Sequence, residues 1–201
     1  YDLNGVSYNA TSETDCTAGT WQNETGQSSC KDADAGYYAT PTIATYQKPC
    51  EAGTYQEDTG QTSCDYAEAG YYSPGTVGGA NVDSSVTTVA TSDIPCAAGT
   101  YIATSGASSC TDAAAGTYSN GTISVNGVMV PATSETDCGS GTYQADTGQS
   151  SCDDADAGYY VSTAGETSQS MCAAGTWQNE TGKTTCKAVS YTHLRAHETS
   201  I

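Results

Sequence analysis

The sequence predicts a small disulfide-rich, all-β protein, an elongated tandem array of short β-hairpin modules with little hydrophobic core. Three observations predict this fold class. The 201-residue chain has ten Cys but no Phe, two Trp and two Met, too little apolar volume for one large core. The cysteines are regularly spaced. Gly and Thr-Tyr segments, which favour turns and short strands, recur with them.

The cysteines form five pairs whose members lie 14 positions apart in every case. The sequence between the two cysteines of a pair is similar in all five: CTAGTWQNETGQSSC, CEAGTYQEDTGQTSC, CAAGTYIATSGASSC, CGSGTYQADTGQSSC and CAAGTWQNETGKTTC. After four of these pairs the second Cys begins a shorter echo: CKDADAGYY, CDYAEAGYY, CTDAAAGTY and CDDADAGYY. Such repetition is typical of stacked small modules, and ten cysteines favour this interpretation over a disordered polar chain.

Within each pair we expect a β-hairpin or open loop that is tied at its base. A Gly two residues before an aromatic ring, as in Gly19 and Trp21, predicts a close backbone approach followed by a ring. A second Gly after Thr or Ser, such as Gly60, predicts a turn near the hairpin tip. No segment has helical periodicity.

The constant spacing favours disulfides within each unit, because bridges across the variable spacers would require no fixed length. A bridge closing a loop of about 15 residues contributes roughly 3 kcal/mol by restricting the unfolded chain. In the alternative, bridges cross the spacers, and Cys16 and Cys186 bond to cysteines outside this sequence. The predicted bridges are Cys16–Cys30, Cys50–Cys64, Cys96–Cys110, Cys138–Cys152 and Cys172–Cys186.

The cysteine pairs also predict how the chain is divided. We expect the N-terminus of a secreted precursor to be missing, because no signal-like segment begins at Tyr1. The predicted segments are 1–15, the end of a preceding repeat or spacer; 16–49, 50–95, 96–137 and 138–171, four repeats; 172–188, a truncated fifth repeat; and 189–201, a foreign tail.

The motif C-x-x-G-T-[YW]-x₈-C, followed by Gly-x-Tyr or Gly-Tyr-Tyr, resembles the ephrin-receptor-like cysteine-rich repeats, which are related in style to growth-factor-receptor modules. The resemblance covers Thr17 to Lys187 in five copies. It implies an extracellular or cell-surface ectodomain module, and in that family a second disulfide closes each Gly-x-Tyr half.

Both cysteines of that second bridge are replaced in this sequence, which further supports pairing of the remaining cysteines within each unit. The first is replaced by Ala33, Ala67, Ala113 and Ala155, and the second by Gln47, Asp93, Glu135 and Gln169.

Charge and residue types exclude several functions. The formal net charge of −18 disfavours nucleic acid, which needs a basic surface, and no apolar run reaches the length of a membrane span. Residues 1–187 contain no His and no Arg, the usual general base and phosphate clamp. We therefore expect no enzymatic activity and no membrane-spanning segment here, and any partner to be an extracellular protein or a glycan.

Two acidic segments invite a calcium interpretation, because alternating carboxylates before Gly resemble oxygen-ligand loops. The equivalent third copy, TDAAAG, lacks this pattern, so we favour solvated acidic turns over weak calcium sites and expect no other cofactor. The carboxylates concerned are Asp32, Asp34, Asp154 and Asp156.

Two further sets of positions are candidate sites. Possible N-glycosylation sequons occur at Asn9, Asn23, Asn120 and Asn179. A possible binding ladder recurs at one repeat position, at Trp21, Tyr55, Tyr101, Tyr143 and Trp177. With so few other large side chains, we favour rings that pack on a disulfide or on the neighbouring Gly-Tyr-Tyr segment.

The composition changes at Val189. The string VSYTHLRAHET holds the only Arg and both His residues of the chain, and it resembles the in-frame translation of a sequencing adapter. His193 and His197 have the i, i+4 spacing of a helical zinc pair. We nevertheless expect no zinc binding, and interpret 189–201 as an adapter-derived artefact.

Together these features predict a non-catalytic, extracellular cysteine-rich segment, a structural spacer or adhesive ectodomain of a larger surface protein. One alternative is a ligand-binding receptor module that uses the repeated rings, and another is a stalk attached to a catalytic domain outside this sequence. Ring exposure distinguishes the first two: buried rings favour the spacer, and rings aligned on one open face favour the binder.

Overall fold

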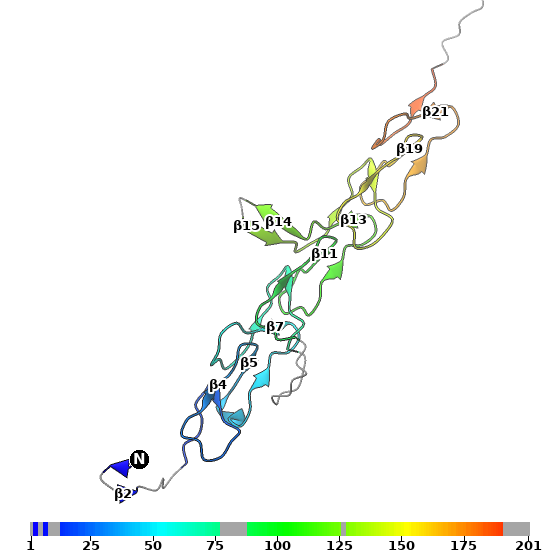
Figure 1. Cartoon of the computed structure of the whole chain (residues 1–201). Helices are drawn as coiled ribbons and strands as arrows, with labels where there is room; N and C mark the ends of the chain where they lie inside the picture. The colour runs from blue at the N-terminus through cyan, green and yellow to red at the C-terminus, as the bar shows by residue number, and fades with distance from the viewer. Residues whose placement is uncertain (1, 4–5, 8–12, 77–87, 126–127, 191–201) are drawn as a thin grey trace, which may run out of the picture. The chain divides into compact units, whose positions relative to one another are not determined.

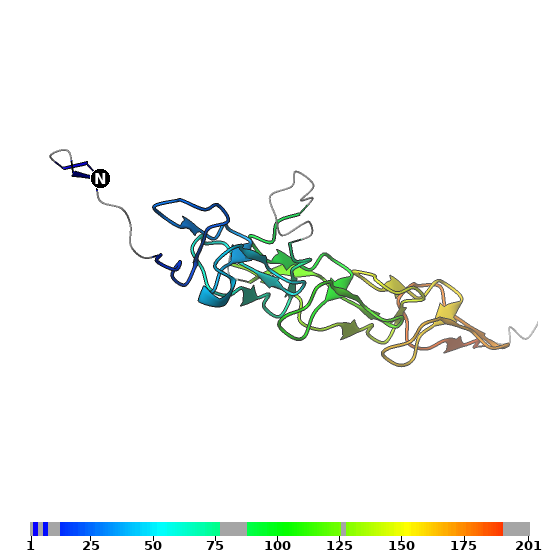
Figure 2. The same ribbon diagram turned by 90° about the horizontal axis from the view of Figure 1, so that it is seen from below.

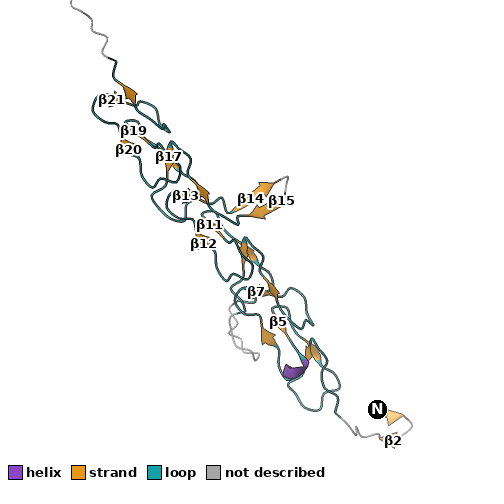
Figure 3. Ribbon diagram, turned by 180° about the vertical axis from the view of Figure 1, so that it is seen from behind, coloured by secondary structure: helices purple, strands orange, loops and turns teal. Residues whose placement is uncertain are grey.

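The computed structural model describes residues 2–3, 6–7, 13–76, 88–125 and 128–190. The chain forms two compact units, one comprising residues 1–95 with 104–110 and the other 96–103 with 111–201. Both consist of short antiparallel strand pairs connected by loops, and Figure 3 shows one short helical turn within the described residues. The all-β, disulfide-rich repeat fold predicted from the sequence is confirmed.

The strands of the first unit are two residues long. They are β1 Asp2–Leu3, β2 Val6–Ser7, β3 Thr20–Trp21, β4 Lys31–Asp32, β5 Tyr37–Tyr38, β6 Lys48–Pro49, β7 Thr54–Tyr55, β8 Asp65–Tyr66, β9 Tyr71–Tyr72 and β10 Ile94–Pro95, with the 3₁₀ turn η1 at Pro41–Ile43.

The second unit repeats this arrangement and adds one longer hairpin, β14–β15, between β13 and β16 (Figure 1). Its strands are β11 Thr100–Tyr101, β12 Thr111–Asp112, β13 Thr117–Tyr118, β14 Thr122–Val125, β15 Val128–Pro131, β16 Thr136–Asp137, β17 Thr142–Tyr143, β18 Asp153–Asp154, β19 Tyr159–Tyr160, β20 Ser170–Met171, β21 Thr176–Trp177 and β22 Lys187–Ala188.

Each of the first four repeats consists of two half-units with the same strand register. We call the segment that starts at the first Cys of a pair a Cys half-unit, and the segment that starts at the following buried Ala an Ala half-unit. In the first repeat, β3 pairs with β4 and β5 pairs with β6, both antiparallel. The Ala half-units start at Ala33, Ala67, Ala113 and Ala155, all of which are 0% exposed.

Disulfides close the Cys half-units. Their Cα–Cα distances are 5.7–5.8 Å in the four bridges Cys16–Cys30, Cys50–Cys64, Cys138–Cys152 and Cys172–Cys186. Cys96 and Cys110 are disulfide-bonded as well. The four bridges agree with pairing within each repeat and exclude pairing across the spacers for these cysteines.

Backbone hydrogen bonds connect successive half-units at equivalent positions. In the first unit, the Gly36 N–H donates to the Gln56 carbonyl over 2.7 Å, and the Gly60 N–H donates to the Ala33 carbonyl over 2.7 Å. In the second unit, the Gly158 N–H donates to the Gln178 carbonyl over 2.7 Å. Neighbouring half-units of one unit therefore satisfy each other's polar backbone groups, and Figure 2 shows the strand pairs following one another within each unit.

The apolar core is thin. One cluster of buried residues comprises Trp21, Ala33 and Ala39. Among the described residues, the largest fully buried side chains are three Cys and two Ser rather than aliphatic residues. So little buried apolar surface leaves covalent closure and backbone pairing as the main stabilising contributions.

Candidate functional site

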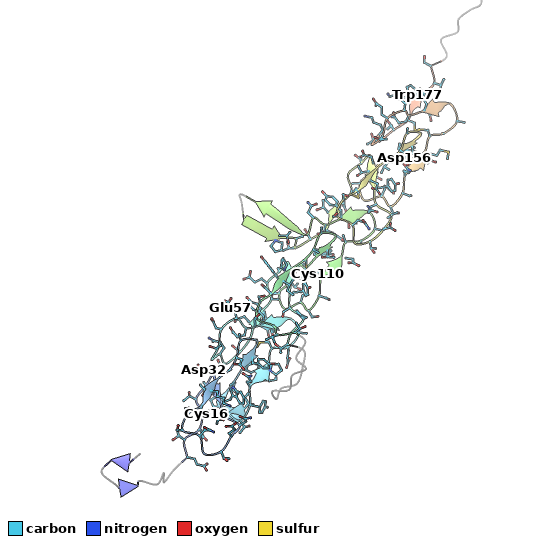
Figure 4. The ribbon with its side chains drawn as sticks, viewed as in Figure 1. Cys16, Asp32, Glu57, Cys110, Asp156 and Trp177 are labelled. Atoms are coloured by element: carbon cyan, nitrogen blue, oxygen red, sulfur yellow. A yellow bond between two sulfur atoms is a disulfide. The ribbon has the colours of Figure 1, made fainter. Side chains whose placement is uncertain are left out.

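The repeated ring position is the first candidate site, and its members differ in exposure. Trp21 in β3 is only 7% exposed, and the rings of Tyr55, Tyr101 and Tyr143 are half-buried. Trp177 in β21 is 41% exposed and lies in the last described hairpin (Figure 4). The four N-terminal rings thus pack within the fold, and Trp177 is the most exposed of the five rings.

Lysine ammonium groups lie over both tryptophans. The Lys31 Nζ is 5.3 Å from the centroid of the Trp21 ring, and the Lys187 Nζ is 5.1 Å from that of Trp177. Trp and Lys are opposite each other in both antiparallel pairs, β3–β4 and β21–β22. A cation over the ring face contributes about 0.5–1 kcal/mol at exposed sites. The buried Trp21 Nε1 has no hydrogen-bond partner among the described residues.

Two tyrosines and a surface lysine have raised pKa values. Burial raises the pKa of the Tyr55 hydroxyl, and nearby carboxylates, Asp93 foremost, raise it further. Burial also raises the pKa of Tyr37, with a second contribution from Asp34. Hydrogen bonding to Tyr38 and to Glu51 raises the pKa of Lys48. Burial and contacts with neighbouring side chains cause these shifts, and none of the three groups is a nucleophile paired with a base.

The sequence analysis missed a buried glutamine that closes the hairpin loop. The Gln144 Nε2 donates to the Ser151 carbonyl over 2.9 Å, and its Oε1 accepts from the Asp146 N–H over 3.1 Å. Equivalent bonds are made by Gln22, Gln56 and Gln178. This glutamine directly follows the repeated ring in four of the five repeats, and that recurrence in the sequence could have revealed it. The third repeat has the buried Ile102 at this position instead.

The carboxylates considered for calcium are partly engaged elsewhere. The Asp34 Oδ2 accepts from the Gln47 Nε2 over 2.7 Å, and the Asp156 Oδ2 accepts from the Gln169 Nε2 over 2.7 Å. Asp32 and Asp154 lie in strands β4 and β18, and the described residues hold no cluster of three or more potential metal ligands. The preference for solvated acidic turns over weak calcium sites at these positions stays a prediction.

Three of the four sequon asparagines are described, and all three are exposed: Asn23, Asn120 and Asn179. Asn9 lies outside the described residues. Asn120 borders an open depression of ≈ 560 Å³ between Tyr118 and Asp137, whose described lining combines hydroxyls, a carboxylate and a ring. The titratable side chains of this described lining are Tyr118 and Asp137.

The hydrogen-bond pattern of the repeat continues as far as Val189, the first residue of the predicted foreign tail. The Val189 N–H donates to the Gly175 carbonyl over 2.9 Å, as the Ala33 N–H does to the Gly19 carbonyl. Val189 therefore occupies the first position of an Ala half-unit. His193 and His197, the residues considered for zinc, lie outside the described residues.

Comparison with known proteins adds no family assignment. No protein family model matches this chain, and no curated protein matches it significantly. Among the described residues, no helix is long and apolar enough to cross a membrane. The chain is a cysteine-rich repeat protein by its own disulfides and strand register, and its resemblance to ephrin-receptor-like repeats rests on the motif alone.

Proposed function

We propose that this chain is a non-catalytic extracellular segment of a larger surface protein, and that it acts as a structural spacer or adhesive ectodomain of the ephrin-receptor-like type. The observation that carries the proposal is the use of the repeated rings inside the fold. Because Trp21 is 7% exposed and three equivalent tyrosines are half-buried, the repeated ring position serves packing within the repeat.

The disulfides support an extracellular location. Bridges that close thin units persist in oxidising surroundings and are rare in the cytosol. A net charge of −18 suits a solvated surface that resists self-association. The absence of His and Arg from residues 1–187 supports a chain without catalysis of its own, so that any catalytic domain it carries lies elsewhere.

A repeat deletion tests the spacer. Removing residues 138–171 joins two segments at equivalent positions of the repeat, and we expect it to shorten the distance between labels at the two ends by a fixed step. Double electron–electron resonance on spin labels at Glu13 and Lys187 measures that distance. An unchanged mean distance would contradict the spacer function.

A second function has one specific observation in its favour. Trp177 is 41% exposed with the Lys187 ammonium over its ring, a surface suited to a sugar or a protein loop. Binding to a glycan array that is lost in Trp177→Ala and retained in Trp21→Ala would support this receptor function over the spacer.

A further inference from the structure

The Ala half-units keep the register of the Cys half-units although they have no disulfide. Cys16 and Cys30 lie four and two residues before the paired positions Thr20 and Asp32. In the neighbouring Ala half-unit, Ala33 and Gln47 lie four and two residues before the paired positions Tyr37 and Pro49. The same offsets relate Ala155 and Gln169 to the pairing of β19 with β20.

Insertions do not disturb this relation. The segment from Ala67 to Asp93 is longer than that from Ala33 to Gln47, and the segment from Ala113 to Glu135 carries the β14–β15 hairpin. The positions of Asp93 and Glu135 relative to the strands that follow them, β10 and β16, nevertheless equal that of the second Cys. The geometry of closure is therefore kept while the loop length varies.

In each Ala half-unit a polar side chain spans the gap that the disulfide spans in a Cys half-unit. The Gln47 Oε1 accepts from the Asp34 N–H over 2.7 Å, and the Gln169 Oε1 accepts from the Asp156 N–H over 2.6 Å. Both glutamines also donate from Nε2 to the side chain of that same Asp, over 2.7 Å. Each of these N–H groups belongs to the residue directly after the buried Ala.

The two Ala half-units with longer segments use a carboxylate in the same place. The Glu135 Oε2 accepts from the Ala114 N–H over 2.7 Å and from the Thr117 hydroxyl over 2.9 Å. The Asp93 Oδ2 accepts from the Glu68 N–H over 3.3 Å. Amide and carboxylate oxygens share only the capacity to accept this bond, which identifies the backbone N–H as the common target.

We propose that Gln47, Asp93, Glu135 and Gln169 are closing residues that replace a disulfide, and that the two kinds of closure are interchangeable within the repeat. The buried Ala occupies the register position of the first Cys, and the polar residue occupies that of the second. An Ala half-unit therefore closes without an oxidant, whereas a Cys half-unit requires one, and the two alternate along each unit.

Engineered cross-linking tests the proposal. In the full chain, Ala155→Cys with Gln169→Cys should form a sixth disulfide spontaneously, seen in non-reducing mass spectrometry as a cross-linked peptide joining positions 155 and 169 and as a raised melting temperature. The matched control is Ala155→Cys with Ser168→Cys, because Ser168 is the exposed neighbour of Gln169. Free thiols in the first variant, or equal cross-linking in both, would overturn the proposal.

The reverse exchange tests interchangeability in a Cys half-unit. Cys172→Ala with Cys186→Gln should keep the Val189 N–H, which bonds Gly175, at least tenfold more protected from hydrogen exchange than Cys172→Ala with Cys186→Ala. Both variants lack the bridge, so only the glutamine differs. Equal exchange rates at Val189 would show that the amide does not close the half-unit.

Discussion

At the residue scale, Gly141 combines two separate constraints. Its φ is +91°, in the left-handed region that other residues avoid, and a Cβ there would collide with the carbonyl oxygen of Gly182 in a later half-unit. Gly175 occupies the equivalent position with a φ of +83°, but a Cβ there would meet none of the described residues within 4 Å. Comparing substitutions at Gly141 and Gly175 therefore separates the effect of backbone strain from that of crowding between half-units.

We predict that Gly141→Ala destabilises the protein more than Gly175→Ala does. Both changes impose left-handed strain of roughly 1–2 kcal/mol, and Gly141→Ala adds overpacking of about 1–3 kcal/mol. Urea denaturation of the two variants measures the difference. Equal losses of unfolding free energy would mean that the half-units do not approach each other as closely as the structure shows.

The raised pKa of Tyr55 predicts that the protein loses stability at alkaline pH. Burial and nearby carboxylates raise its folded-state pKa, and burial raises that of Tyr37, so the folded state holds these protons more tightly than the unfolded chain. Their contribution is fully present below the unfolded pKa of about 10 and is lost as the pH rises through the folded pKa. The urea midpoint should fall above about pH 10, and it should fall less in Tyr55→Phe. A Tyr55→Phe profile identical to that of the parent would contradict this assignment.

At the scale of elements, two-residue strands cannot hold a hairpin by pairing alone, since isolated hairpins are marginal in water. Each Cys half-unit gains its closure from a bridge worth roughly 3 kcal/mol in the chain-entropy model. The buried Gln144 adds hydrogen bonds to Ser151 and Asp146 inside the loop. Closure, rather than core packing, therefore defines the element.

Reduction of the disulfides should unfold the Cys half-units at ambient temperature. The bridges close these half-units, and the largest fully buried side chains among the described residues are Cys and Ser rather than large apolar residues. The measurement is near-UV circular dichroism, in which Tyr and Trp signals should collapse after full reduction and thiol blocking. A sample treated with the blocking reagent alone is the control, and an unchanged spectrum after reduction would exclude stapling by disulfides.

The sequence predicted these elements where the information is local. The constant spacing from Cys16 to Cys30 indicated the bridge, and Gly60 indicated the tip turn that its φ of +70° confirms. The close backbone approach predicted at Gly19 is confirmed, but its partner Gly60 belongs to a different half-unit, which spacing alone did not identify. The loop-closing role of Gln56 was missed because a glutamine in a sequence is usually taken for a surface residue, and its hydrogen-bond partners in the loop are known only from the structure.

At the scale of the whole molecule, repetition of one pattern of closure and backbone bonding makes stability roughly additive along each unit. Alternation also explains why an insertion such as the β14–β15 hairpin is tolerated: β13 still pairs with β16 across it. Loop length costs little entropy once the closing positions are held.

Bridges close four of the repeats within themselves, and disulfide mapping tests this closure most directly. Non-reducing proteolysis of the oxidised chain followed by mass spectrometry identifies which cysteines are linked. We predict linked peptides for Cys16–Cys30, Cys50–Cys64, Cys138–Cys152 and Cys172–Cys186. Peptides that link Cys30 to Cys50, or Cys152 to Cys172, would show that the bridges cross the spacers and would contradict closure within the repeat.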